Sequence, residues 1–190
     1  MPDPTAGGML RAEAPAVHGS TRTSQPGIGD PGDVTGFAAY LTAMSAALYN
    51  ATILRLAAAI PYDERLPDAQ ASAEKRSPIC GSRVTVDVAL DADGRVSAIG
   101  QEVRACALGQ ASASLMGAHA IGRSADELEA ARDALAGYLA GTRDDVGDWP
   151  GLDIFLPARA YSARHPSIRL AFEAVADAAR DAGRHREAAA

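Results

Sequence analysis

Two cysteines are the residues of this sequence best suited to chemistry, because a thiolate is a strong nucleophile and a good ligand for soft metals. They are Cys80, in the segment PICGS, and Cys106, in the segment CALGQASASLM. Asp93 lies midway between them in sequence, at the centre of a predicted turn. A β-hairpin brings together residues equidistant from its turn, so we expect the two thiols to face each other.

Neighbouring residues bear on what the two thiols could do. Both cysteines share sequence parity with Val84, which predicts one side of the hairpin for both, although a one-residue shift in register would separate them. Cys106 is expected just before the first turn of a helix, where unpaired N–H groups and the helix dipole favour the thiolate. Gly81 allows the backbone after Cys80 to bend closely around a bound group. Paired thiolates suit zinc or an iron cluster, but two ligands do not complete a tetrahedral site. On spacing alone, two small buried core residues are an equally good interpretation.

The elements that must position these thiols follow from the hydrophobic pattern. Valines alternate with polar residues in RVTVDVAL, and the turn DADG joins this segment to RVSAIGQEV, which predicts a hairpin over residues 83–103. Before it, a helical stripe over 37–60 ends at Pro61, and the polar, proline-bounded segment 61–78 is predicted to be an irregular connection.

Helices are predicted after the hairpin. The small residues of 107–121 suit a helix packed closely against a sheet, and Ser124 with Glu127 forms a capping box that opens the next helix. A loop that carries Trp149 and Phe155 leads to a final helix from about residue 163 to 183. These two aromatic side chains would anchor the loop to the body or serve a partner. The order predicts an α+β fold, with the hairpin and a third strand, if one is present, packed against several helices.

Composition narrows the class of protein. The chain has 190 residues and a formal charge of −6, which argues against nucleic acid and anionic membranes as partners. It has no long apolar run, and two cysteines do not make a secreted disulfide framework, so a cytoplasmic protein is expected. We expect a disordered extension over 1–43, one domain over 44–183 and a disordered tail over 184–190. Translation could begin downstream of this extension, at Met44.

The motifs around the cysteines resemble one known family. PICGS at 78–82, the hairpin, and CALGQASASLM at 106–116 are similar to the SufU branch of the U-type iron-sulfur scaffolds, which include IscU and the amino-terminal domain of NifU. LYNATIL at 48–54 is similar to the amino-terminal helix of that family, and the stretch after Gly122 resembles the SufU insertion. The resemblance covers about residues 48–180 and implies a SufE/NifU-like fold.

The resemblance implies a set of metal ligands, and this sequence departs from that set at two positions. In the family, three cysteines and an aspartate hold zinc or a nascent cluster, and Cys80 and Cys106 match the first two cysteines. Ser82 stands at the aspartate position and Ser167 at the third cysteine position. A serine hydroxyl is not ionised at neutral pH and is a poor ligand. His165 is the candidate for a compensating ligand, and a solvated surface histidine is the alternative.

Three hypotheses follow. The first is a scaffold or carrier, with no turnover chemistry of its own, that binds iron, zinc or a nascent cluster through Cys80 and Cys106. His165, or the thiols of a second protomer in a homodimer, would complete the site. The resemblance implies a cysteine desulfurase and iron-sulfur acceptor proteins as partners. The second hypothesis is a redox or sulfur-relay pair that takes persulfide from the desulfurase. The third is a degenerate paralogue that acts only through partner surfaces.

Overall fold

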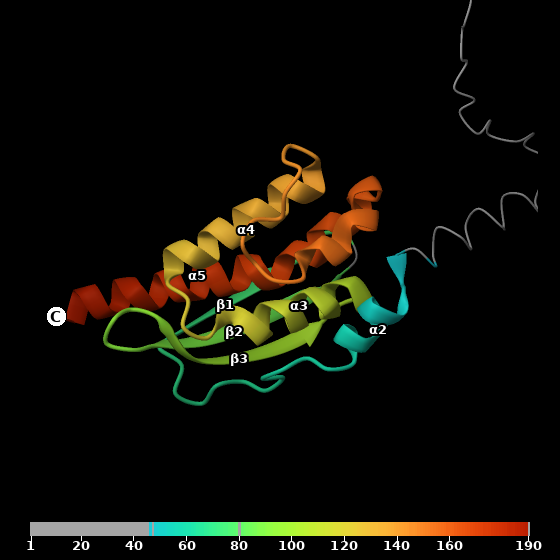
Figure 1. Cartoon of the computed structure of the whole chain (residues 1–190). Coiled ribbons are helices and arrows are strands. Elements are labelled where there is room, and N and C mark those ends of the chain that lie inside the picture. Colours follow the sequence, from blue (N-terminus) through green and yellow to red (C-terminus); the bar gives the residue numbers. More distant parts are fainter. Residues whose placement is uncertain (1–45, 47, 80, 190) are drawn as a thin grey trace, which may run out of the picture.

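The computed structural model describes residues 46, 48–79 and 81–189 (Figure 1). A three-stranded antiparallel sheet packs against helices there, which confirms the predicted α+β class. The predicted extension 1–43 and Cys80 lie outside the described residues, as does much of the predicted helix over 37–60. The elements are α2 (Ala51–Ala57), β1 (Ala71–Arg76), β2 (Arg83–Leu90), β3 (Val96–Arg104), α3 (Ala107–Ala120), α4 (Ala125–Ala140), the 3-10 helices η1 (Leu152–Ala160) and η2 (Ser162–Arg164), and α5 (His165–Ala189).

The third strand lies in a segment predicted to be an irregular connection, and that prediction is wrong for β1. The strand order is β1-β2-β3, so β2 is central. Ala71 is buried, Ala73 is half-buried, and Lys75 is ion-paired with Asp177 of α5. Two alanines and a lysine give no alternation of large apolar side chains, and such alternation is the signal that predicts a strand.

The hairpin register differs from the predicted one by a single residue. A turn centred on Asp93 would set Val84 opposite Glu102, whereas the structure pairs Val84 with Val103. The cause is a bulge next to Ala89, because an extra residue on one strand displaces all pairs beyond it. The ladder ends at Arg83 and Arg104, so strand parity does not decide on which side Cys106 lies.

Helices α3 and α5 cover one face of the sheet, and α4 packs on α5 (Figure 1). Val84, Val86 and Val88 of β2 are fully buried beneath this helical layer. The segment before β1 crosses the other face, where Leu66 N and Arg65 donate hydrogen bonds to Asp87. The central strand is therefore covered on both faces, which explains why most of its residues are buried.

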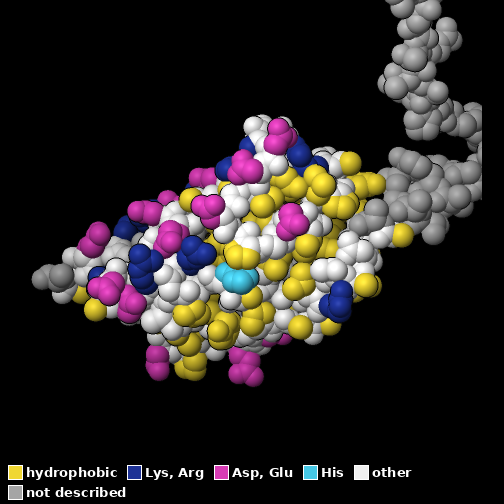
Figure 2. All heavy atoms as spheres, viewed as in Figure 1, with side chains coloured by type: hydrophobic (Ala, Val, Ile, Leu, Met, Phe, Trp, Pro, Cys, Tyr) yellow, Lys and Arg dark blue, Asp and Glu magenta, His cyan; other side chains and the backbone are white. Residues whose placement is uncertain are grey.

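The two terminal helices show how the chain closes over the sheet. Ser124 and Glu127 form the predicted capping box of α4, and Gly141 ends that helix in a left-handed conformation at φ 73°. Helix α5 continues through Gly183 to Ala189, so the tail predicted over 184–190 is helical in its described part. Figure 2 shows charged side chains of both signs intermixed over α4 and α5 and apolar side chains gathered toward the end that carries α2.

The loop after α4 is attached to the body by its aromatic residues. Trp149 is 4% exposed, and its indole Nε1 donates a hydrogen bond to the carbonyl of Leu115 in α3 at 3.1 Å. Its ring also contacts the edge of Phe172 in α5, with ring centroids 5.1 Å apart. Phe155 of η1 is fully buried. This confirms the predicted anchoring role of Trp149 and Phe155.

Candidate functional site

Cys106 is the N-cap residue of α3, which confirms its predicted place before the first helical turn. Its carbonyl accepts the first hydrogen bond of the helix, from Gln110 N at 2.9 Å. Its side chain makes no capping hydrogen bond and is half-buried, as a free thiol. Cys106 therefore stands at the start of α3, where the leading N–H groups have no partner within the helix.

Three predicted site residues from distant parts of the sequence meet at this helix start. Cys106 Sγ lies 3.2 Å from Ser167 Oγ in the first turn of α5, and Ser167 Oγ lies 3.3 Å from Ser82 Oγ just before β2. Ser167 is 1% exposed and Ser82 is 5% exposed. We call Ser82, Cys106 and Ser167 the cysteine cluster; Cys80 lies outside the described residues. The structure thus brings together Cys106, Ser82 and Ser167, three of the residues that the resemblance indicated as site positions.

Gly109 permits the close approach of α3 and α5 at the cluster. A Cβ added to this glycine would lie 2.6 Å from Ser167 Oγ and 2.9 Å from the Ser167 carbonyl oxygen, closer than real contacts allow. Ser112, one turn further along α3, donates its hydroxyl hydrogen to the carbonyl of Ile168. The run of small residues in α3 predicted close packing in general, but the sequence did not indicate that position 109 faces the cluster.

His165 is directed elsewhere. Its Nε2 lies 2.9 Å from the carbonyl oxygen of Ala158 in η1. Residues two apart on a helix do not face each other, so His165 and Ser167 point in different directions from the start of α5. With Nε2–H donated to Ala158, the free ring nitrogen would be Nδ1, an arrangement common in metal-ligating histidines. The predicted ligand role of His165 stays a prediction.

The chemistry of the cluster is set by one thiol and two hydroxyls. Hydroxyl groups stay protonated at neutral pH, so they can donate hydrogen bonds to a thiolate but are weak metal ligands. In the part of the chain that the structure describes, no three His, Cys, Asp or Glu side chains are arranged to hold a metal ion. A tight resident metal would therefore need ligands beyond those that the described residues supply.

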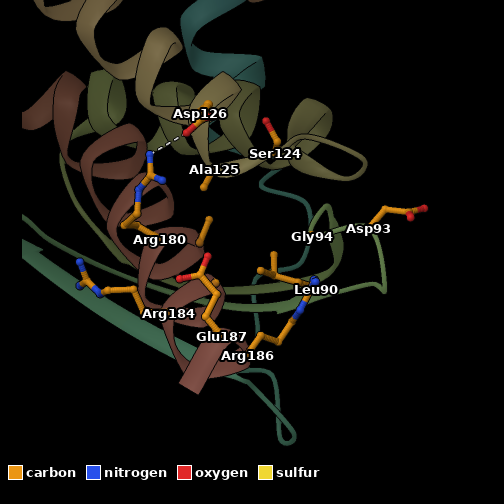
Figure 3. A pocket seen from close by; sticks show the side chains of 12 residues that line it. Leu90, Asp93, Gly94, Ser124, Ala125, Asp126, Arg180, Arg184, Arg186 and Glu187 are labelled. Atoms are coloured by element: carbon orange, nitrogen blue, oxygen red, sulfur yellow. Dashed lines mark hydrogen bonds and ion pairs between the residues drawn. The ribbon is translucent and has the colours of Figure 1, made fainter. Parts of the chain in front are cut away.

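A hollow of about 620 Å³ lies at the end of the sheet away from the cysteine cluster. It is enclosed by the hairpin turn, the start of α4 and the end of α5 (Figure 3). Several of its charged side chains have partners within the chain. Arg180 pairs with Asp126 and Glu129, and Arg186 donates hydrogen bonds to the carbonyls of Asp91 and Ala92. These contacts hold the hairpin turn and α4 against α5, so Arg180 and Arg186 have a structural role.

Comparison with known proteins places the chain in a family. No family model matches, and no curated protein matches. Solved structures do: the amino-terminal part of a nitrogen-fixing NifU-like protein from Brucella abortus is 42% identical, with a TM-score of 0.69. The alignment covers 74% of this chain and 98% of that one. The chain therefore belongs to the U-type scaffold family, as a relative of NifU amino-terminal domains.

A more distant structure has the same fold. It is a putative iron-sulfur cluster assembly scaffold protein for the SUF system from Fervidobacterium islandicum AW-1, with 20% identity and a TM-score of 0.66. The alignment covers 71% of this chain and 98% of that chain.

Proposed function

We propose that this protein is a scaffold or carrier in iron-sulfur cluster assembly and that iron, zinc or a nascent cluster is its cargo. Family membership supports the role. The single structural observation that carries the site is the meeting of Cys106 with Ser82 and Ser167 at the start of α3. The sequence places Cys80 two residues before Ser82. Cys80 and Cys106 are the proposed thiolate ligands.

The serines determine the character of the proposed site. Two thiolates with neutral hydroxyls hold a soft metal less tightly than three thiolates and a carboxylate would. Weak holding suits a carrier that must release its cargo. His165 would add a ligand through Nδ1 if the first turn of α5 moved toward Cys106, and the thiols of a second protomer are the other proposed source.

The proposed partners are a cysteine desulfurase that supplies sulfur and acceptor proteins that receive the product. Within the described residues, the helices are too short or too polar to cross a bilayer. The partially exposed thiol of Cys106 is accessible to a partner that approaches the start of α3.

Anaerobic reconstitution with ferrous iron and sulfide tests the proposal. We expect bound iron and a cluster absorbance band in the wild type and the loss of both in the Cys80→Ser, Cys106→Ser double variant. His119→Gln is the matched control, because His119 lies on α3 outside the cluster and should retain the wild-type iron content. The His165→Gln variant measures the histidine contribution. Equal iron in the double variant and the wild type would overturn the proposal.

A sulfur relay by the same thiols is the second candidate. It is favoured by the absence of a three-ligand metal group among the described side chains and by the partial exposure of Cys106. Incubation with a cysteine desulfurase and cysteine, followed by intact-mass measurement, distinguishes the two. A mass increase of one sulfur atom that disappears in Cys106→Ser, in a protein that binds no iron, would favour the relay. If the chain acquires neither sulfur nor iron, the result would favour a paralogue that acts only through its surfaces.

A further inference from the structure

Three arginines form a row across the sheet at the end near the cysteine cluster. Arg76 of β1 is the direct cross-strand partner of Arg83 in β2, and Arg83 is the direct partner of Arg104 in β3. Directly paired residues in antiparallel strands project from the same face. Their parity matches that of Asp87, so the row lies on the face opposite the helical layer.

This arrangement costs stability, and the chain offsets the cost only in part. Like charges directly opposite each other repel. Glu74 accepts a hydrogen bond from Arg76 at 2.6 Å, and Glu102 pairs with Arg83 at 3.1 Å and with Arg104 at 3.0 Å. The hydrogen bond from Arg76 lowers the pKa of Glu74, so this carboxylate stays charged at neutral pH. Three guanidinium groups against two carboxylates leave one positive charge in excess, in a chain whose total charge is −6.

The row is exposed at both ends and is close in sequence to two members of the cluster. The side chains of Arg76 and Arg104 are 68% and 70% exposed. The three arginines, with Ser77 and Gly81, line a hollow of about 280 Å³. Gly81 belongs to the loop that leads to Ser82, and Cys106 follows Arg104 by two residues. A group bound in this hollow would therefore contact the same two chain segments that carry Ser82 and Cys106.

We propose that the Arg76–Arg83–Arg104 row is a docking site for an acidic segment of the partner protein that exchanges cargo at Cys106. Exposed guanidinium groups bind carboxylates through paired, charge-assisted hydrogen bonds. Glu74 and Glu102 lie beside the row, as the two cross-strand partners of Thr85. They would repel a continuous polyanion such as nucleic acid, whereas the spaced carboxylates of a peptide can avoid them. The exchange of cargo rests on the proposed function; the recognition of carboxylates does not.

Fluorescence anisotropy with a labelled peptide of alternating glutamate and alanine tests the docking site. We expect the full-length wild type to bind this probe at low salt and to release it as salt is added. The Arg76→Gln, Arg104→Gln double variant should bind roughly tenfold more weakly, since both exposed ion pairs with the peptide are lost. A peptide with glutamine in place of glutamate should not bind.

The matched control is Arg55→Gln, Arg184→Gln, which removes the same charge from α2 and from the end of α5. It should bind the acidic peptide as the wild type does. Equal weakening in both double variants, or no binding by the wild type, would overturn the proposal. Far-UV circular dichroism confirms that each variant folds. Measurement of the iron content tests the proposed function separately. A chain that binds the peptide through the row but holds no iron would refute the scaffold role and leave the docking site supported.

Discussion

On the proposed function, the side chain at position 167 would limit how strongly the cysteine cluster holds a metal. Ser167 Oγ lies within 3.3 Å of both Cys106 Sγ and Ser82 Oγ, so it is central to the cluster. We expect Ser167→Cys to tighten zinc binding by roughly tenfold or more, because a thiolate replaces a neutral hydroxyl as ligand. Competition with a chromophoric chelator under reducing conditions measures this affinity.

The control for this substitution is Ser114→Cys. Ser114 is also buried, and its hydroxyl donates to the carbonyl of Ala59, away from the cluster. A thiol at that position should leave zinc affinity unchanged. If both variants gained the same affinity, or if Ser167→Cys gained none, the geometry of the cluster would not be the cause.

The sequence could predict the members of the cluster but not its contacts. Cys106, Ser82 and Ser167 were found through motif resemblance, and the helix start at Cys106 followed from the pattern of small residues. The direction of His165 could not be predicted, because it depends on η1, whose carbonyl at Ala158 engages the ring. The position of Arg76 beside Arg83 could not be predicted either, because it depends on the strand β1, which the sequence pattern did not indicate.

At the scale of elements, the close contact of α3 with α5 depends on Gly109. A methyl group there would collide with backbone and side-chain oxygens of Ser167. We expect Gly109→Ala to lower the free energy of unfolding by about 1–3 kcal/mol, because the helices must separate to admit it. Urea denaturation followed by circular dichroism measures the change, and metal binding should weaken in the same variant.

Gly183→Ala is the matched control for the helix contact. Gly183 lies within α5, and an added Cβ would meet no atom within 4 Å. Alanine in a helix loses less backbone entropy on folding than glycine, so this variant should gain about 0.5–1 kcal/mol. We expect the change in the free energy of unfolding to have opposite signs at the two glycines. A stabilised Gly109→Ala protein would contradict the close packing of α3 on α5.

The capping box of α4 predicts a pH dependence of stability. The hydrogen bond from Ser124 N, helped by those from Arg95 and Arg123, lowers the pKa of Glu127 from 4.5 to about 2. A carboxyl group with a lowered pKa in the folded state stabilises the protein above its unfolded pKa, and this contribution is lost as the pH falls through the folded value. We expect Glu127→Gln to flatten the decline of stability between about pH 5 and pH 2.

Urea midpoints at several pH values measure this effect. Glu64→Gln is the control, because Glu64 is exposed on the segment before β1 and its variant should keep the wild-type slope. If the urea midpoint fell equally steeply with decreasing pH in the Glu127→Gln variant and in the wild type, the capping box would not be the cause of the loss of stability in acid.

The elements show where sequence patterns suffice and where they fail. The capping box and the alternating valines of β2 are local signals, and both predictions were correct. The register was wrong by one residue because a bulge near Ala89 depends on how the strands twist together, which no local pattern encodes. The edge strand β1 was missed because its inward residues are small or charged and gain their burial from α5.

At the scale of the whole molecule, the insertion between α3 and α5 is part of one folding unit. Trp149 connects α3 and α5 through its hydrogen bond to Leu115 and its contact with Phe172. It is the only tryptophan of the chain, so its fluorescence reports on the insertion alone. We expect fluorescence and far-UV circular dichroism to give the same urea midpoint. A fluorescence transition at lower urea would show that the insertion detaches first.

On the proposed function, the start of α3 would couple the loading of cargo to the stability of the fold. The side chain of the N-cap residue Cys106 makes no capping hydrogen bond, and the first N–H groups of α3 have no partner within the helix. Negative charge that arrives with a thiolate-bound cargo would satisfy these groups, so each delivery would also finish a helix. Binding to the folded chain alone raises its melting temperature, and the loaded protein should outlast the metal-free one on heating. A donor that fills this chain would thereby protect it from unfolding, and an acceptor that empties it would return it to its less durable form.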